Sequence, residues 1–260
     1  MDPRITLIGA LVGLLVGMSG VGGSSLMAPL LILVVRLNPL VAVGTDLLYS
    51  VPTKLLGAYL HWRQGTVDRK ILLWLALGGV PGAVLGLGAL VLVRAHTNEA
   101  TLNTIIKHAV GAMLILVAAM MLLTPLLTRL PGRKPRPQMQ ADVAPRRRQL
   151  IVLGALVGFC VSLTSIGSGS LTVPVLYLLA PQLGLRRLIG SNIAFAALLV
   201  PISAIGHLGL GDTDLRVSAN LLLGSLPGVF VGSRLCAKLP DLWLRPAMAG
   251  ILVWAGAALV

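Results

Sequence analysis

The sequence predicts an all-α polytopic membrane protein with two inverted-topology repeats, each a broken or re-entrant helical pair followed by three spanning helices. Three observations lead to this prediction. The 260 residues are 56% hydrophobic and 11% charged, whereas about a quarter of the residues in soluble domains are charged. Six apolar runs have the length of a bilayer crossing. The second half of the chain also repeats the first.

Six spanning helices are expected where uninterrupted apolar runs approach the roughly 20 residues that a crossing requires. The runs cover residues 43–61, 71–93, 104–127, 188–208, 217–236 and 243–260. Two further apolar regions, 5–36 and 149–181, are too long for one crossing, and Gly/Ser clusters interrupt both. Their halves, of about 12 to 15 residues, indicate a re-entrant hairpin or a pair of short, tilted helices.

An internal duplication divides the chain. A shift of 145 residues gives 10 identities in the 21 positions from 9 to 29. A shift of 146 then aligns Gly44-Thr45-Asp46 with Gly190-Ser191-Asn192, and His61 with His207. We therefore expect a first transmembrane repeat at 1–128, a basic linker at 129–148 and a second transmembrane repeat at 149–260.

The basic residues predict the orientation. The linker has seven of them from Arg129 to Arg148, so we place it in the cytoplasm. Counting crossings outward puts 15 of the 21 basic residues on the same side. Each repeat then has an odd number of crossings, so the repeats face opposite ways. Both termini are then expected on the outer face of the membrane, opposite the linker.

We thus attribute the net charge of +13 to the basic residues that orient the chain in the membrane. Because the basic residues form no aromatic-interleaved patch, we expect no nucleic-acid partner. The expected partners are the lipid bilayer and a small anion, and a homo-oligomer stays open.

The two broken segments are the first candidate for an anion site. In carriers with inverted repeats, the substrate lies near the midplane where discontinuous helices meet. Helix N-termini there would offer backbone N–H groups and hydroxyls to an anion. The residues are Gly22, Gly23, Ser24, Ser25, Gly167, Ser168, Gly169 and Ser170. Close helix packing is the alternative, but two clusters at matching positions favour binding.

Lys54 is a cation near the middle of the expected helix 43–61, where a charge costs at least about 2.5 kcal/mol. It shares one helical stripe with Asp46, Ser50, Gly57 and His61. Asp46 is two turns away, about 12 Å, which is too far for a direct ion pair. We interpret Lys54 as the counter-charge for an anionic substrate; pairing with a carboxylate of another helix is the alternative. Hydrogen bonds to the substrate are expected from Thr45, Ser50, Thr53, Ser191 and Asn192.

Proton coupling has three candidates, Asp46, His61 and His207. Asp46 either titrates or caps its helix, and the two histidines act as relays or as interfacial anchors. The proton gradient would supply the energy, so no cofactor is expected. No metal site is expected either, because Cys160 and Cys236 lack metal-ligand spacing.

The sequence also disfavours an enzyme, and a membrane-embedded enzyme stays open as the less favoured alternative. It contains no intramembrane pair of carboxylates and no Ser/His/Asp constellation, so we do not expect an enzyme. Two aspartates, Asp68 and Asp214, follow glycine turns and are predicted helix N-caps. Close helix crossings are predicted at Gly78, Gly82, Gly86, Gly88, Gly224, Gly228 and Gly232.

Four motifs of the first repeat carry a family resemblance. They are Gly20-Val-Gly-Gly with Ser24, Leu26 and Pro29; Val43-Gly-Thr-Asp-Leu; Thr53-Lys54; and His61-Trp-Arg-Gln-Gly-Thr-Val-Asp68. Together they resemble the sulfite exporter TauE/SafE family of bacterial membrane proteins. The likeness continues through the second repeat and covers nearly the whole chain.

The resemblance implies a secondary transporter, and in particular an exporter, of small sulfur-containing anions such as sulfite, thiosulfate or sulfoacetate, driven by the proton gradient. A passive anion channel would use the same residues. The sequence departs from the common pattern at Ser24, where the family often has a third consecutive glycine, and in the second broken segment. These departures concern the ligand and leave the fold unaffected.

Overall fold

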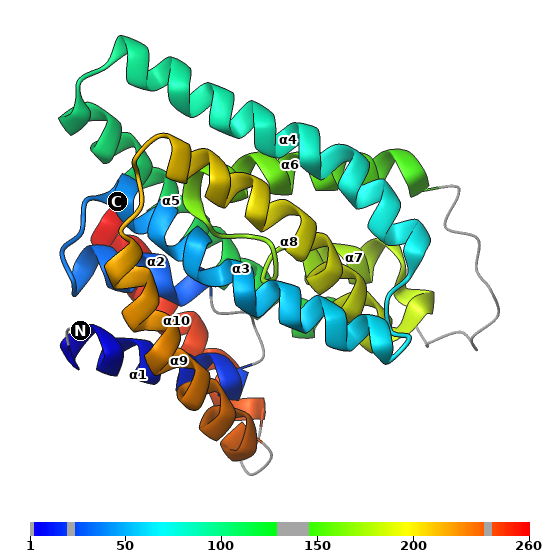
Figure 1. The fold of residues 1–260 in the computed structure, drawn as a ribbon. Coiled ribbons are helices and arrows are strands. Elements are labelled where there is room, and N and C mark those ends of the chain that lie inside the picture. Colours follow the sequence, from blue (N-terminus) through cyan, green and yellow to red (C-terminus); the bar gives the residue numbers. More distant parts are fainter. Residues whose placement is uncertain (1–2, 20–23, 129–145, 237–240) are drawn as a thin grey trace.

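The computed structural model describes residues 3–19, 24–128, 146–236 and 241–260, and the regular elements in these ranges are helices (Figure 1). In chain order they are α1 (Pro3–Ser19), α2 (Ser24–Leu33), α3 (Pro39–Arg63), α4 (Arg69–His96), α5 (Glu99–Thr128), α6 (Arg147–Thr164), α7 (Thr172–Leu179), the 3-10 turn η2 (Pro181–Leu183), α8 (Gly184–Gly209), α9 (Leu215–Cys236) and α10 (Asp241–Leu259). The six predicted spanning runs correspond to α3, α4, α5, α8, α9 and α10.

Four helices of the described ranges are long and apolar enough to cross a bilayer, namely α4, α5, α6 and α8. The helix α3 has 25 residues, but Asp46 and Lys54 interrupt its apolar sequence. The expectation of similar halves in the broken regions is wrong. The second region consists of α6 with 18 residues and α7 with 8, and the first of α1 with 17 and α2 with 10. The break in each region nevertheless lies near its middle, after Ser19 and after Thr164, as expected; the helix lengths differ because the first helix starts before the apolar run and the second ends before the run does.

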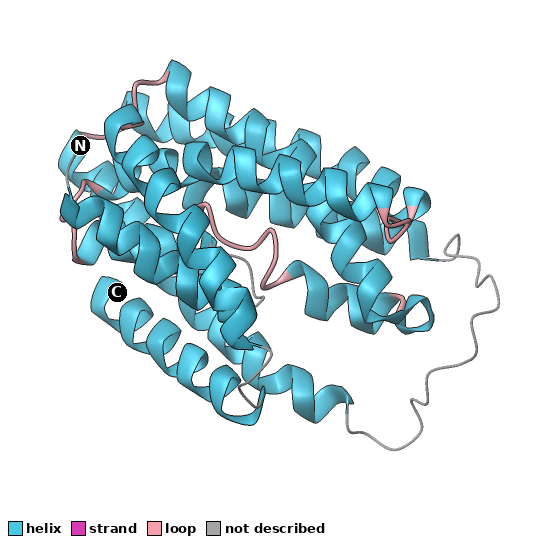
Figure 2. Cartoon of the chain, turned by 60° about the horizontal axis from the view of Figure 1, so that its bottom comes forward, coloured by secondary structure: helices cyan, strands magenta, loops and turns pink. Residues whose placement is uncertain are grey.

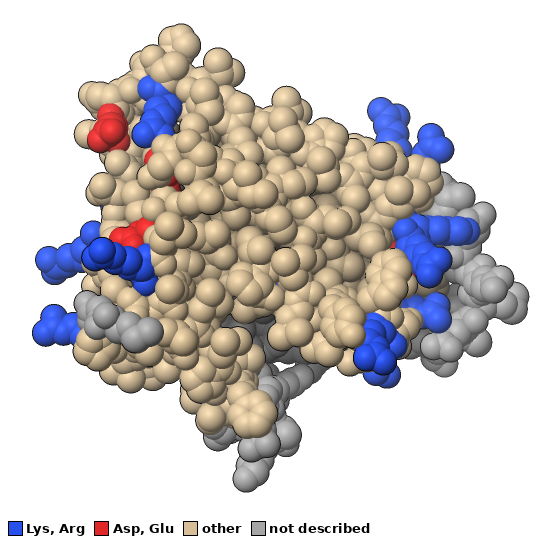
Figure 3. All heavy atoms as spheres, viewed as in Figure 1, with Lys and Arg blue, Asp and Glu red and all other residues tan. Residues whose placement is uncertain are grey.

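The molecular surface has the character of an integral membrane protein. In Figure 3, charged side chains gather at two ends of the visible face, and the wide area between them carries almost none. Large apolar side chains such as Leu85, Phe230 and Trp254 are exposed. An apolar surface of this extent is suited to lipid, because in water it would drive aggregation.

Helix contacts recur in pairs under the shift that aligns the two halves of the chain. The helix α4 packs along α6, and its counterpart α9 packs along α1 (Figure 1). A Cβ added to Gly78 would lie 2.8 Å from the Ile151 carbonyl carbon. The equivalent Cβ on Gly224 would lie 2.9 Å from the Thr6 carbonyl carbon. Each half of the chain thus packs a helix against a helix of the other half, so closely that glycine is required.

The other predicted packing glycines behave in two ways. A Cβ on Gly82, Gly86 or Gly228 would also approach a neighbouring helix backbone too closely, whereas Gly88 has nothing within 4 Å. Gly88 is therefore not a packing residue, and the surroundings of Gly232 lie outside the described residues.

Two equivalent helices, α3 and α8, form the centre of the molecule and run antiparallel. Near one end of the pair Gly44 faces the Asp212 backbone, and near the other end Gly190 faces the Thr66 backbone. The helices α5 and α10 cross at glycines 145 positions apart. A Cβ on Gly111 would lie 2.9 Å from the Gly256 carbonyl oxygen, and a Cβ on Gly256 3.0 Å from that of Gly111.

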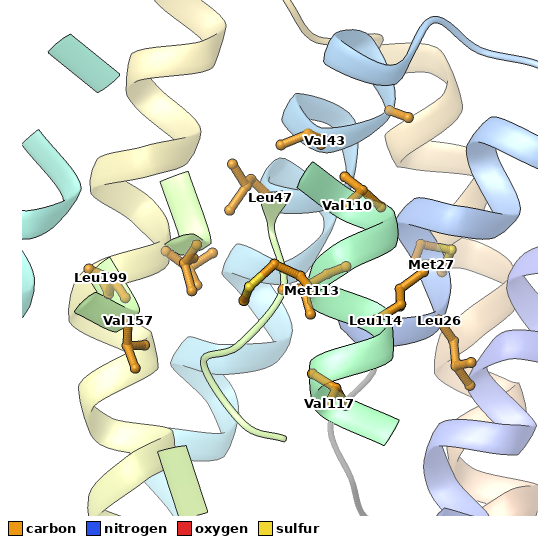
Figure 4. Close-up of a cluster of buried hydrophobic side chains, with 14 of the residues drawn as sticks. Leu26, Met27, Val43, Leu47, Val110, Met113, Leu114, Val117, Val157 and Leu199 are labelled. Carbon is orange, nitrogen blue, oxygen red and sulfur yellow. The ribbon is translucent and has the colours of Figure 1, made fainter. Parts of the chain in front are cut away.

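A shared apolar core holds the central helices around α5. Figure 4 shows Met113 and Leu114 of α5 between Leu47 of α3, Leu26 of α2 and Leu199 of α8. This packing fixes the position of α3, which carries Asp46 and Lys54, relative to the second broken region. The predicted N-caps are confirmed, because the Asp68 and Asp214 carboxylates each accept two backbone N–H bonds, from Lys70 and Ile71 and from Arg216 and Val217.

Candidate functional site

The second broken region forms a helical hairpin whose tip lies inside the molecule. The helix α6 ends at Thr164, and Ser165 then adopts a left-handed conformation with φ 62°. The Arg146 guanidinium, just before α6, donates to the carbonyl groups of Leu178 and Leu179 at the end of α7. The two outer ends of the hairpin therefore lie together. Figure 2 shows the loop between α6 and α7 running through the middle of the helical body, whereas the other described loops lie at its ends.

Backbone conformation explains the break. Gly167 has φ 118°, a region that side chains with a Cβ rarely adopt. The Thr164 hydroxyl accepts a bond from the Ile166 N–H at 3.2 Å, and the Thr172 hydroxyl donates to the Gly167 carbonyl at 2.9 Å. Local hydroxyls thus replace part of the helical hydrogen bonding that the loop gives up. Ser168, Gly169 and Ser170 lie in the turn that leads into α7.

Asp46 connects the hairpin tip to α3. Its Oδ2 accepts a bond of 2.6 Å from the Ser165 hydroxyl, and the carboxylate is fully buried. Its other oxygen, Oδ1, has no hydrogen-bond partner in the described structure, nor has the hydroxyl of the buried Ser168. Buried polar atoms are nearly always satisfied by protein, water or ligand. Two such oxygens near one loop therefore indicate a place where a ligand or water binds.

Asp46 is not a helix cap. The helix α3 begins at Pro39 after Asn38, which places Asp46 two turns inside it. The capping alternative for Asp46 is therefore wrong, because its carboxylate bonds to Ser165 of α6–α7 and not to the first turn of its own helix.

Lys54 lies eight residues further along α3 and is half-buried. It interacts electrostatically with Asp46, and among the described residues it forms no ion pair of the kind that Arg94 forms with Asp212. Side chains in a helix lean toward its N-terminus, so the long lysine chain extends toward Asp46. Between the two charges lies Ser50, which is buried. The Thr53 hydroxyl is engaged locally, donating to the Ser50 carbonyl at 2.8 Å.

Two predicted hydroxyls lie at the junctions between helices. The Thr45 hydroxyl accepts a bond of 2.9 Å from the Asp214 N–H. Its counterpart Ser191 accepts one of 2.8 Å from the Asp68 N–H and donates to the Arg187 carbonyl. These bonds connect each central helix to the N-cap of the opposite half. We therefore assign Thr45 and Ser191 to the junctions.

The structure places Asn192 away from Asp46. Its neighbour Ile193 lies beside Gly57, where an added Cβ would be 3.1 Å from the isoleucine methyl. Gly57 is 11 residues after Asp46, about 16 Å along α3. The amide oxygen of Asn192 is buried without a partner in the described structure. Asp46 and Asn192 thus lie at two different levels along α3, and Lys54 lies between these levels in the sequence of α3.

The first broken segment is described in part. Gly22 and Gly23 lie outside the described residues. Ser24 begins α2, and Ser25 is buried within it.

The two histidines differ. His207 is fully buried, so the interfacial-anchor alternative is wrong for it, and its Nε2 lies 2.8 Å from the Ser162 carbonyl oxygen. His61 is half-buried and its Nδ1 lies 2.8 Å from the Thr66 hydroxyl. The sequence analysis missed Ser162 and Ser203, whose hydroxyls hydrogen-bond each other at 2.7 Å. A signal was available, because Ser203 and His207 are four residues apart on α8 and thus share one face.

No group of three His, Cys, Asp or Glu side chains in the described ranges is arranged to hold a metal ion. Hydroxyls, one carboxylate and one ammonium make up the central site. Such a set can bind a small anion and hold a proton.

Comparison with known proteins identifies the family. The family model for the sulfite exporter TauE/SafE matches residues 5–259. The chain belongs to the sulfite exporter TauE/SafE family. It is 41% identical, over the full length of both chains, to a probable membrane transporter protein of Bacillus subtilis, YjnA. A second probable membrane transporter protein of that organism, YdhB, is 25% identical over 96% of this chain and 98% of its own. One from Xylella fastidiosa is 26% identical over 88% of this chain and 83% of its own. No solved structure matches significantly.

Membership of the TauE/SafE family, together with these relatives, makes the chain a membrane transporter. The sequence resemblance is thereby confirmed.

Proposed function

We propose that this TauE/SafE protein is a proton-coupled secondary transporter that exports small sulfur-containing anions, sulfite or organosulfonates, across the bacterial inner membrane. The observation that carries the proposal is Lys54, half-buried within α3 and without an ion pair among the described residues. An ammonium at that depth needs a counter-charge, because burying an unpaired charge is costly. A transported anion supplies it.

The paired helix contacts support two inverted-topology repeats. The junction at Thr45 and Asp214 corresponds to the junction at Ser191 and Asp68, and the two occur at opposite ends of the antiparallel α3–α8 pair. A carrier with such repeats exposes its site alternately by moving one half against the other. In this proposal the linker 129–148 is cytoplasmic, both termini are periplasmic, and the Asp214 junction faces the periplasm.

Asp46 is the proposed proton carrier. It is buried beside the same loop as Ser168, and it lies within electrostatic range of Lys54. A proton on Asp46 removes a negative charge that would repel the anion, so proton and anion occupancy are coupled. A doubly charged sulfite that moves with one proton carries one net negative charge, and the membrane potential, negative inside, drives that charge outward with about 2.3 kcal/mol per 100 mV. Export of such an anion is thus the direction that the potential favours.

The test is transport in proteoliposomes with radiolabelled sulfite, thiosulfate and sulfoacetate under an imposed pH gradient. We expect the wild type to accumulate sulfite against its concentration gradient. Lys54→Ala should lose roughly 10- to 100-fold of the uptake, the worth of a charge-assisted hydrogen bond. The control Lys107→Ala removes another lysine, from α5, and should stay within about two-fold of the wild type.

Three results would change the proposal. Undiminished uptake by Lys54→Ala would remove the proposed anion site. Anion that equilibrates without accumulating would identify a passive channel, since a channel cannot use the pH gradient. Lack of transport of all three anions would show that the substrate class is wrong.

A further inference from the structure

A row of polar side chains leads from Asp46 to one end of the molecule. The Ser165 hydroxyl donates to Asp46 at 2.6 Å. One turn earlier on α6, the Ser162 hydroxyl bonds with the Ser203 hydroxyl of α8 at 2.7 Å. One turn later on α8 lies His207. All four side chains are buried, so the row crosses the apolar interior between α3, α6 and α8.

The steps between these bonds are short. Side chains three or four residues apart on a helix have Cβ atoms about 5 to 6 Å from each other. That interval applies between Ser203 and His207, which both lie within α8, and one bridging water can span it. Ser162 and Ser165 are three residues apart in sequence, with Ser165 directly after the last residue of α6. A hydroxyl both donates and accepts, so each serine can take a proton on one side and release its own on the other.

His207 has one nitrogen fixed and the other free. A carbonyl can only accept a hydrogen bond, so Nε2 donates its proton to Ser162 and is held in place. In the neutral ring Nδ1 is then an unprotonated acceptor, and it has no partner in the described structure although the side chain is fully buried. Histidine is the side chain best suited to gain and lose a proton near neutral pH.

Asp212, which is buried, lies between this histidine and the partly exposed Arg94. It follows α8 in the turn where its backbone N–H bonds to the His207 carbonyl at 3.0 Å, and its carboxylate pairs with Arg94 at 3.1 Å. Burial raises the pKa of Asp212 above its ordinary value of 3.8, an effect that Arg94 and His207 partly offset. Among the described residues, Asp212 acts on His207, and Arg94 of α4 and Glu99 of α5 act on Asp212. At the other end of the row, Lys54 and Tyr49 of α3 interact electrostatically with Asp46.

The other half of the chain lacks the row. The positions equivalent to Ser162, Ser165 and Ser203 are occupied by Gly17, Gly20 and Gly57, which have no hydroxyl. His61 is present, but it bonds to Thr66 at the other end of the α3–α8 pair. The half of the chain that contains α3 therefore has no counterpart of the Ser162, Ser165 and Ser203 hydroxyls at the aligned positions.

We propose that protons reach Asp46 from the Asp212 end alone, through His207 and the hydroxyls of Ser203, Ser162 and Ser165. A proton on the Asp212 carboxyl passes to Nδ1 of His207, and the imidazolium releases its Nε2 proton to the Ser203 hydroxyl, which releases its own; a flip of the ring then restores the starting tautomer. Ser162 and Ser165 repeat this exchange, and Ser165 delivers a proton to Oδ2 of Asp46. No bond other than O–H and N–H changes. The inference rests on the proposed function, since a proton path requires proton coupling.

The experiment compares two modes of sulfite transport in proteoliposomes, with protein-free liposomes subtracted to remove passive entry of sulfur dioxide. One mode is uptake driven by a pH gradient, which needs proton movement. The other is exchange of labelled for unlabelled sulfite at equal pH, which needs only binding and the conformational change. A damaged fold lowers both modes, whereas a blocked proton path lowers the first.

His207→Gln is the main variant, because the amide still donates to Ser162 but cannot carry a proton. We expect gradient-driven uptake to fall about 10-fold or more, as for loss of a positioned proton-transfer group, with exchange kept within about two-fold. The double variant Ser162→Ala/Ser203→Ala should behave in the same way, and it removes both partners of one hydrogen bond, so no orphan hydroxyl is left. The control is His96→Gln, at the exposed end of α4, which should change neither mode.

The outcomes separate the two proposals. If wild-type vesicles show no gradient-driven sulfite uptake, the proposed function is wrong and the proton path falls with it. If the wild type shows it and both variants keep it, the proposed function stands and the path is wrong. Equal loss of both modes also overturns the path, because the residues would then support the fold. An equal selective loss in His61→Gln would overturn the restriction to one end.

Discussion

Replacing Gly78 by alanine tests the helix contacts on which the repeat architecture rests. An added Cβ would lie 2.8 Å from the Ile151 carbonyl carbon and 2.9 Å from the Ala155 nitrogen. Both atoms are backbone of α6 and cannot rotate away, so the two helices must separate. Overpacking of this kind lowers the free energy of unfolding by about 1–3 kcal/mol. We expect a value near the upper limit, because the clashing atoms belong to the backbone.

Alanine also favours a helix over glycine, by about 1 kcal/mol. The net loss for Gly78→Ala is therefore about 2 kcal/mol. Gly88→Ala, on the same helix, meets nothing within 4 Å and should gain up to about 1 kcal/mol. The two variants should thus differ by about 3 kcal/mol, or roughly 6–12 °C in Tm for a chain of this size.

The assay is thermal stability of the detergent-purified protein, followed by fluorescence-detected size exclusion. Gly224→Ala, the counterpart of Gly78→Ala in the second half, should lose about as much, because its Cβ would meet the Thr6 backbone in the same way. Equal Tm values for Gly78→Ala and Gly88→Ala would refute the reasoning, since only the contact with α6 distinguishes them.

Two further predictions concern aspartates at the helix ends. Asp68→Ala removes the N-cap of α4 and should lower stability by about 1 kcal/mol, whereas Asp68→Asn keeps an acceptor for the same N–H groups; equal Tm values for the two variants would contradict the capping role. Because the pKa of Asp212 is raised in the folded protein, the folded state binds that proton more tightly than the unfolded state. Its contribution to stability is complete below the ordinary carboxyl value of 3.8 and is lost as pH rises through the higher folded value. Asp212→Asn should remove this part of the pH dependence of Tm, and an unchanged slope would show that other groups cause it.

Much of the architecture was predictable from sequence because it depends on local patterns. Apolar runs of bilayer length predicted six spanning helices. All six runs are helical, and α4, α5 and α8 among them are long and apolar enough in the described ranges to cross a bilayer, as is α6 of the second broken region. The glycine turns before Asp68 and Asp214 predicted both N-caps, since capping needs only the residues next to the helix. The lengths of the broken halves were not predictable in this way, because Ser165 ends α6 by adopting a left-handed conformation that a hydropathy pattern does not reveal.

The candidate site was predictable only by residue type. Sequence reasoning selected Asp46, Lys54 and the loop that contains Ser168, and the structure joins that loop to Asp46 through Ser165; the same reasoning also grouped Asn192 with them. The helical stripe on α3 indicated which residues share a face. It gave no information on how far along α3 the residues of α8 would lie, because that depends on the antiparallel packing of the two helices.

By itself the sequence determined that the chain is a helical membrane protein, that its two halves are related and that it is a TauE/SafE protein. These properties depend on composition, spacing and motif, which are features of the linear sequence and need no knowledge of long-range contacts. Only the tertiary structure decided that Ser165 bonds to Asp46, that Thr45 and Ser191 belong to helix junctions, and that Ser162, Ser203 and His207 form one row. Each of those contacts joins residues more than 40 positions apart, and it exists because glycines let particular helices approach and apolar packing fixes their register.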